Sequence, residues 1–264
     1  MTTLCEKNRA AVSTRFMFHV CLIIQIFMGV FAWALAMGAA PKLEFSENYL
    51  AIFGTAVVGL AILAYPISYL FTWTWDSRFF GASMFPFASA SFLGGYPLLC
   101  ITQHGALPLL VRGAIFVIYI GLIICWCRKI AEIYKKIYSS KSLFESIYFE
   151  SADVVYYLQR EDIKTLKKHF KFDLNPPLSY LLVPVLVALS ISPFASSASQ
   201  FAGVPFVHIF LAIIGLPLNF FFLGVCTKGW LVFYHYPNKI RYNSSMLTYV
   251  DLSSTLKNYE DARH

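Results

Sequence analysis

The fold is decided by the stretch FMFHVCLIIQIFMGVFAWALAMG at residues 16–38. None of its 23 residues is charged. A helix needs about 20 apolar residues to cross the roughly 30 Å hydrocarbon core of a bilayer. The stretch is longer than the core of a secretory signal, about 7–15 residues, and a second apolar run follows at 49–73. We therefore interpret 16–38 as a retained membrane helix rather than a cleaved signal.

Further apolar runs that are uncharged or nearly uncharged lie at 106–127, 178–198 and 205–227. Hydrophobic residues make up 58% of the chain and charged residues 13%, against about 25% charged residues in soluble domains. A soluble fold could not cover so much apolar surface with so few charges. The runs and the composition together predict an all-α, polytopic integral membrane bundle.

A sixth apolar run, at 80–101, is interrupted by Pro86, Gly94, Gly95 and Pro97. Such a run is either a broken span or a re-entrant loop. Basic residues decide between the two, because Lys and Arg gather in cytoplasmic loops. The segment 128–177 carries ten Lys and Arg residues, and it shares a side with the basic amino-terminal tail only if 80–101 crosses. We therefore predict six spans, with both termini and this segment in the cytoplasm.

The predicted spans divide the chain into four regions. These are a membrane region at 1–127, a cytoplasmic helical hairpin at 128–177, a second membrane region at 178–234 and a cytoplasmic tail at 235–264.

The hairpin is predicted from apolar residues at steps of mostly three or four, the spacing of an amphipathic helix. A second amphipathic stretch at 162–170 is too short to cover the whole apolar stripe of the first. We expect the uncovered residues to bind a protein partner or a second copy of the chain. These partner-binding candidates are Ile133, Ile137, Phe144, Ile147 and Val154.

Three cationic or titratable residues within the apolar runs or at their ends are candidates for a pore or for anion binding: Arg112, His208 and Lys228. The simpler interpretation of Arg112 is that its long side chain reaches the membrane surface. The alternative is a contact with an anion or with a backbone carbonyl. Gln25 and Asn219 are more typical of hydrogen bonds between membrane helices.

No pattern of catalytic or metal-binding residues is recognisable in the sequence. It contains no His-Glu-x-x-His, Gly-x-Ser-x-Gly, phosphate-loop or Cys-x-x-Cys sequence. We therefore predict no catalytic residues, no metal and no cofactor. The net charge of +7 is interpreted as the basic bias of cytoplasmic loops rather than as a nucleic-acid surface.

These observations favour a non-enzymatic subunit of the plasma membrane that binds a protein partner through the 128–177 segment and the tail. A membrane assembly, a defence or immunity system and a signalling complex are all compatible with this role. The alternative function is a channel or carrier for a small solute or ion, favoured by the serine-rich, proline-broken runs at 80–101 and 178–198.

Overall fold

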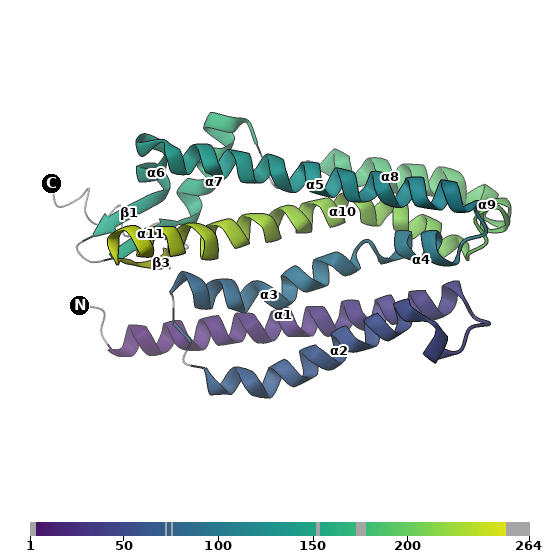
Figure 1. Cartoon of the computed structure of the whole chain (residues 1–264), viewed down its shortest axis with the longest axis horizontal. Coiled ribbons are helices and arrows are strands. Elements are labelled where there is room, and N and C mark those ends of the chain that lie inside the picture. Colours follow the sequence, from purple (N-terminus) through teal and green to yellow (C-terminus); the bar gives the residue numbers. More distant parts are fainter. Residues whose placement is uncertain (1–3, 72, 75, 152–153, 173–177, 252–264) are drawn as a thin grey trace.

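The computed structural model is an elongated helical bundle (Figure 1). It describes the whole chain except residues 1–3, 72, 75, 152–153, 173–177 and 252–264. Within the described residues, five helical stretches are long and apolar enough to cross a membrane, at Thr14–Ala39, Tyr49–Leu70, Leu109–Ser139, Leu182–Ala202 and Phe206–Ser244. These stretches confirm the predicted class, a helical membrane bundle.

The five stretches are built from the following elements. They are α1 (Leu4–Ala39); α2 (Tyr49–Ile67) with the 3-10 turn η2 (Ser68–Leu70); α5 (Leu109–Ser139); α8 (Leu178–Ile191) with η3 (Ser192–Phe194) and α9 (Ala195–Ala202); and α10 (Phe206–Trp230) with the π-helical turn η4 (Leu231–His235) and α11 (Tyr236–Ser244). A short 3-10 turn, η1 (Phe45–Glu47), lies between α1 and α2.

The sixth apolar run forms two shorter helices, α3 (Ser77–Leu93) and α4 (Tyr96–His104), which lie end to end in Figure 1. The helix breaks at Gly94 and Gly95, where the sequence places two residues of low helix propensity. Neither helix belongs to the five long apolar stretches.

Small residues set the spacing of α1 and α2. Gly29 and Gly54 face each other, and a Cβ atom added to Gly54 would lie 3.0 Å from the backbone nitrogen of Trp33. Ala32 and Ala51 are fully buried nearby. Close approach of backbones through small side chains is the usual basis of helix packing in membranes.

One end of the bundle carries a mixed structure that we call the α/β module, residues 130–172 and 231–251. Besides the ends of the long helices it contains α6 (Lys141–Ile147), β1 (Tyr148–Ser151), β2 (Val154–Leu158), α7 (Gln159–Phe170) and β3 (Leu247–Asp251). The strand order is β1-β2-β3, with β1 antiparallel and β3 parallel to β2. The third strand therefore comes from the carboxyl-terminal region.

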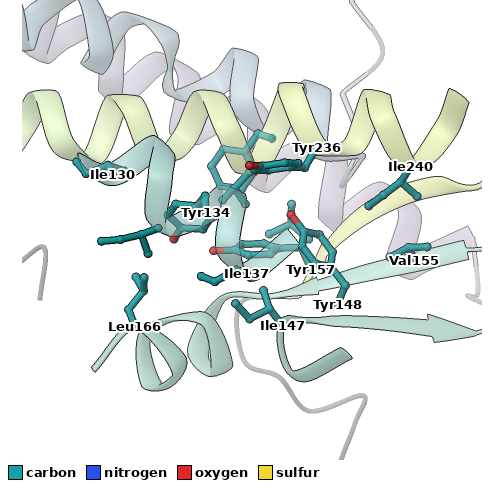
Figure 2. Packing of buried hydrophobic residues seen from close by; sticks show 14 of the residues in the cluster. Ile130, Tyr134, Ile137, Ile147, Tyr148, Val155, Tyr157, Leu166, Tyr236 and Ile240 are labelled. Atoms are coloured by element: carbon teal, nitrogen blue, oxygen red, sulfur yellow. The ribbon is translucent and has the colours of Figure 1, made fainter. Parts of the chain in front are cut away.

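The module differs from the helical hairpin expected over 128–177. The sequences YFES and VVYYL form strands because β-branched and aromatic residues fit a pleated, half-buried surface. α11 and β3, which belong to the tail expected at 235–264, pack within the same module, and residues 252–264 lie outside the described part of the chain. Figure 2 shows side chains of α5, α6, the sheet, α7 and α11 converging on one core, which includes Ile137, Ile147 and Tyr157.

Candidate functional site

A buried ion pair lies where α10 meets the α/β module. The Nζ atom of Lys228 in α10 lies 2.6 Å from Oδ2 of Asp162 in α7. The Asp162 side chain is fully buried and the Lys228 side chain is 14% exposed. Asp162 lies in the first turn of α7, where the helix dipole favours a negative charge.

Two tyrosines complete the surroundings of the Asp162 carboxylate. The Tyr134 hydroxyl, from α5, donates to Oδ2 at 2.8 Å, and the Tyr157 hydroxyl, from β2, donates to the same oxygen at 2.6 Å. We call these four residues the Asp162 cluster. The cluster joins α5, β2, α7 and α10. Its three donors, Lys228, Tyr134 and Tyr157, converge on the carboxylate of Asp162.

The environment keeps the tyrosines of this region protonated. Burial raises the pKa of Tyr157 well above its ordinary value, and the negative charge of Asp162 raises it further. The same two causes, in the same order, raise the pKa of Tyr148, whose hydroxyl is buried without a partner among the described residues. The Tyr157 hydroxyl therefore remains a donor to the carboxylate at physiological pH.

The geometry of the Asp162 cluster suits a structural clamp. The carboxylate uses its acceptor capacity on Lys228, Tyr134 and Tyr157. Removing one partner of such a buried pair typically destabilises a protein by about 3–5 kcal/mol, because the other charge is left uncompensated. The cluster therefore holds the α/β module against α10.

Lys228 is the one member of this cluster among the residues predicted from the sequence. The structure pairs it with Asp162. Asp162, Tyr134 and Tyr157 were missed. The only local signal for Asp162 was the amphipathic pattern of α7, because Asp162 lies one turn before Leu166 on the buried face of this helix.

Arg112 lies at the start of α5 and contacts backbone carbonyls. Its Nη1 donates to the oxygens of Gln103 at 3.0 Å and Thr102 at 3.3 Å. Both carbonyls belong to the last turn of α4, where helix carbonyls lack partners within the helix. Arg112 therefore caps α4, which is the carbonyl-binding alternative considered from the sequence.

His208 is buried between α1 and α10. Its Nε2 lies 2.8 Å from the carbonyl oxygen of Leu35, and its Nδ1 lies 3.3 Å from that of Pro205. Both partners are acceptors, and the contact of Nε2 with Leu35 is the shorter of the two. In this structure His208 connects two helices and, at 1% exposure, does not reach water.

The partner-binding candidates divide into two groups. Ile133, Ile137 and Ile147 are buried in the core of the α/β module, whereas Phe144 and Val154 are half-buried. The expectation that the stripe is left uncovered within the chain is wrong for the three isoleucines. The continuation of α10 and the strand β3 cover them, and the sequence pattern of 128–177 alone contains neither element.

A second polar contact lies inside the bundle, at the break between α3 and α4. The amide of Asn219 in α10 hydrogen-bonds the Tyr119 hydroxyl of α5, and this hydroxyl occupies the space where a side chain on Gly95 would lie. Asn219 is fully buried, and its Oδ1 has no partner among the described residues. The structure thus uses Asn219 between helices, as expected.

Comparison with known proteins adds no information about these sites. No family model matches the chain, and no match was found among curated proteins or solved structures. The function of the chain therefore has to be inferred from its own geometry.

Proposed function

We propose that this chain is a non-enzymatic, multi-pass membrane subunit that binds a protein partner through its α/β module. One observation carries the proposal: the module is clamped to the membrane helices by the buried Asp162–Lys228 pair. A domain attached in this way has a fixed position relative to the bilayer, which suits an assembly or signalling component.

The proposed topology has six passes, with α3 and α4 together forming the third. The first turn of α1 and the strand β3 lie at the end of the bundle that carries the α/β module (Figure 1). An even number of passes accounts for this arrangement. The basic residues of 128–177 assign this end to the cytoplasm.

The proposed binding surface is the outer face of the sheet. Phe149 pairs with Tyr156, and Tyr156 pairs with Tyr249, so three aromatic side chains lie in a row across the strands. Val154 and Leu247 are paired in the same way on this face. All five are half-buried, and in β2 and β3 the residues that alternate with them, Val155, Tyr157, Thr248 and Val250, are buried. Partly exposed aromatic residues are enriched where protein partners bind.

The surface is tested by copurification from a mild detergent. We expect the double variant Tyr156→Ser, Tyr249→Ser to lose the partner while its membrane insertion is unchanged. Tyr242→Ser is the matched control, because Tyr242 lies on α11 and is 90% exposed. If the double variant copurifies with every partner of the parent protein, the outer sheet face is not the binding surface.

A channel or carrier for a small solute or ion is the second candidate. It is favoured by the broken helix at Gly94–Gly95 and by the unpartnered Oδ1 of Asn219 beside it. Broken helices near the membrane midplane form the binding sites of many transporters. Solute uptake into proteoliposomes that Asn219→Leu abolishes, with the fold retained, would favour the carrier over the partner-binding subunit.

A further inference from the structure

A cationic and aromatic cluster lies between the start of the apolar part of α1 and the end of α2. The guanidinium of Arg15 lies 5.3 Å from the ring centre of Tyr69. The His19 ring lies 4.6 Å from the ring of Tyr65 and 5.5 Å from that of Tyr69. We call Arg15, His19, Tyr65 and Tyr69 the Arg15 cluster.

The hydrogen bonds of this cluster leave donors available. Ser68 donates its hydroxyl hydrogen to the carbonyl of Tyr65 at 2.7 Å, so His19 must donate from Nε2 in its 2.8 Å contact with the Ser68 oxygen. His19 is therefore fixed between the two tyrosines. The tyrosine hydroxyls lie 3.2 Å apart and share one hydrogen, which leaves the other hydrogen free to donate outward.

Arg15 adds a positive charge without a matching carboxylate. Its Nε is buried and has no hydrogen-bond partner, and no acidic side chain pairs with it within the part of the chain that the structure describes. A cluster that offers guanidinium and hydroxyl donors, and no carboxylate, is complementary to an anion with several oxygens.

The surroundings indicate what kind of anion it is. The apolar part of α1 begins at Thr14 and the apolar stretch of α2 ends at Leu70, so the cluster lies at the boundary between hydrocarbon and water. Phe16 and Leu70 beside it are 67% and 82% exposed. The Trp73 indole donates to the Ser68 carbonyl at 2.8 Å, and tryptophan is typical of this depth. The ligand therefore needs an acidic head and an apolar tail.

We infer that the Arg15 cluster binds the phosphate of an anionic glycerophospholipid. Arg15 and the tyrosine hydroxyl with the free hydrogen donate hydrogen bonds to the phosphate oxygens. Phe16 and Leu70 contact the acyl chains. His19 is a positioning residue that holds the tyrosine rings. A zwitterionic choline lipid binds less well, because its ammonium group is repelled by Arg15. Basic residues near the cytoplasmic ends of spans commonly attract anionic lipids.

The purified full chain is tested by native mass spectrometry with added phosphatidylglycerol or phosphatidylcholine. We expect the parent protein to prefer phosphatidylglycerol. Arg15→Gln should bind this lipid at least about tenfold more weakly, the effect of losing a hydrogen bond to a charged group. The double variant Tyr65→Phe, Tyr69→Phe keeps both rings and should lose about fivefold. Lys42→Gln and Tyr49→Phe, at the other end of α1 and α2, are matched controls and should bind as the parent does.

Three outcomes would overturn the inference. They are equal binding of the two lipids by the parent, unchanged phosphatidylglycerol binding by both the Arg15 and the tyrosine variants, and full displacement of the lipid by inorganic phosphate. The last result would show a site for the free ion. The tyrosine variant keeps the test decisive if Arg15→Gln does not fold.

Discussion

Asp162 and Lys228 are opposite charges that neither solvent nor lipid can compensate. We expect Asp162→Asn to lower the free energy of unfolding by about 3–5 kcal/mol, because the Lys228 ammonium would remain buried without a counter-charge. The double variant Asp162→Asn, Lys228→Met should regain most of this loss, since a neutral pair of similar size is often as stable as a buried ion pair. Thermal unfolding in detergent, followed by tryptophan fluorescence, measures both. If Asp162→Asn is as stable as the parent protein, the Asp162–Lys228 pair does not hold the α/β module against α10.

The residues of the candidate site were only partly predictable from the sequence. Lys228 stands out because it is a charge at the end of an apolar run. Its partner Asp162 lies in a segment rich in both signs of charge, where several carboxylates are equally plausible. A long-range pair is determined by how α7 packs on α10, and a local pattern of residues carries no information about that packing. The same holds for Arg112. A contact with a backbone carbonyl could be expected from the sequence, but only the fold shows that the carbonyls belong to the end of α4.

At the scale of elements, the membrane helices were predictable and the α/β module was not. Hydrocarbon requires about 20 apolar residues for each helical span, so long runs with few or no charges mark the candidate spans directly. The break at Gly94 and Gly95 was predicted for a similar local reason. The strands β1 and β2 were missed because a strand needs a neighbour. β2 pairs with β1 inside 128–177, but its other neighbour, β3, comes from the carboxyl-terminal region, so this half of the sheet was invisible within the segment.

Burial of Ile147 changes what a charge at this position would do. Ile147 was expected to bind a partner, but it is fully buried in the same core as Tyr148 and Leu166. Ile147→Glu places a charge in this core. A carboxylate in this core would have to be desolvated or protonated, so we expect the α/β module to unfold while the spans insert normally. Limited proteolysis of proteoliposomes should show new cuts within 141–170.

The control for this prediction is Ile163→Glu on α7. Ile163 is 40% exposed, so its carboxylate would remain in water, and the parent cleavage pattern should persist. If Ile147→Glu resists proteolysis as well as Ile163→Glu does, Ile147 is not a core residue.

At the scale of the whole molecule, α10 links the two parts of the structure. It packs on α3, α4, α5 and α8 within the bundle and continues through η4 and α11 into the α/β module. Lys228 lies just before the π-helical turn η4, so the change in helical geometry follows the clamp directly. Irregular turns of this kind often occur where a helix has a functional role. A displacement of the module by a bound partner would therefore act on α10 first.

The number of passes determines on which side of the membrane this displacement would occur. Counting from Ser46, a six-pass chain crosses through α2, the α3–α4 pair and α5 before it reaches Ser140, so the two serines lie on opposite sides. A five-pass chain crosses only through α2 and α5, so they lie on the same side.

Single cysteines at these two positions distinguish the two counts without any assumption about orientation. Ser46 lies in η1 and is exposed, and Ser140 follows α5. In a background that lacks the native cysteines, we expect a membrane-impermeant reagent on intact cells to label Ser46→Cys and to spare Ser140→Cys until the membrane is opened. The basic residues of 128–177 are the reason for this expectation, because they resist transfer across the membrane. Labelling of both positions in intact cells would make α3 and α4 a re-entrant pair and would place the α/β module outside the cytoplasm.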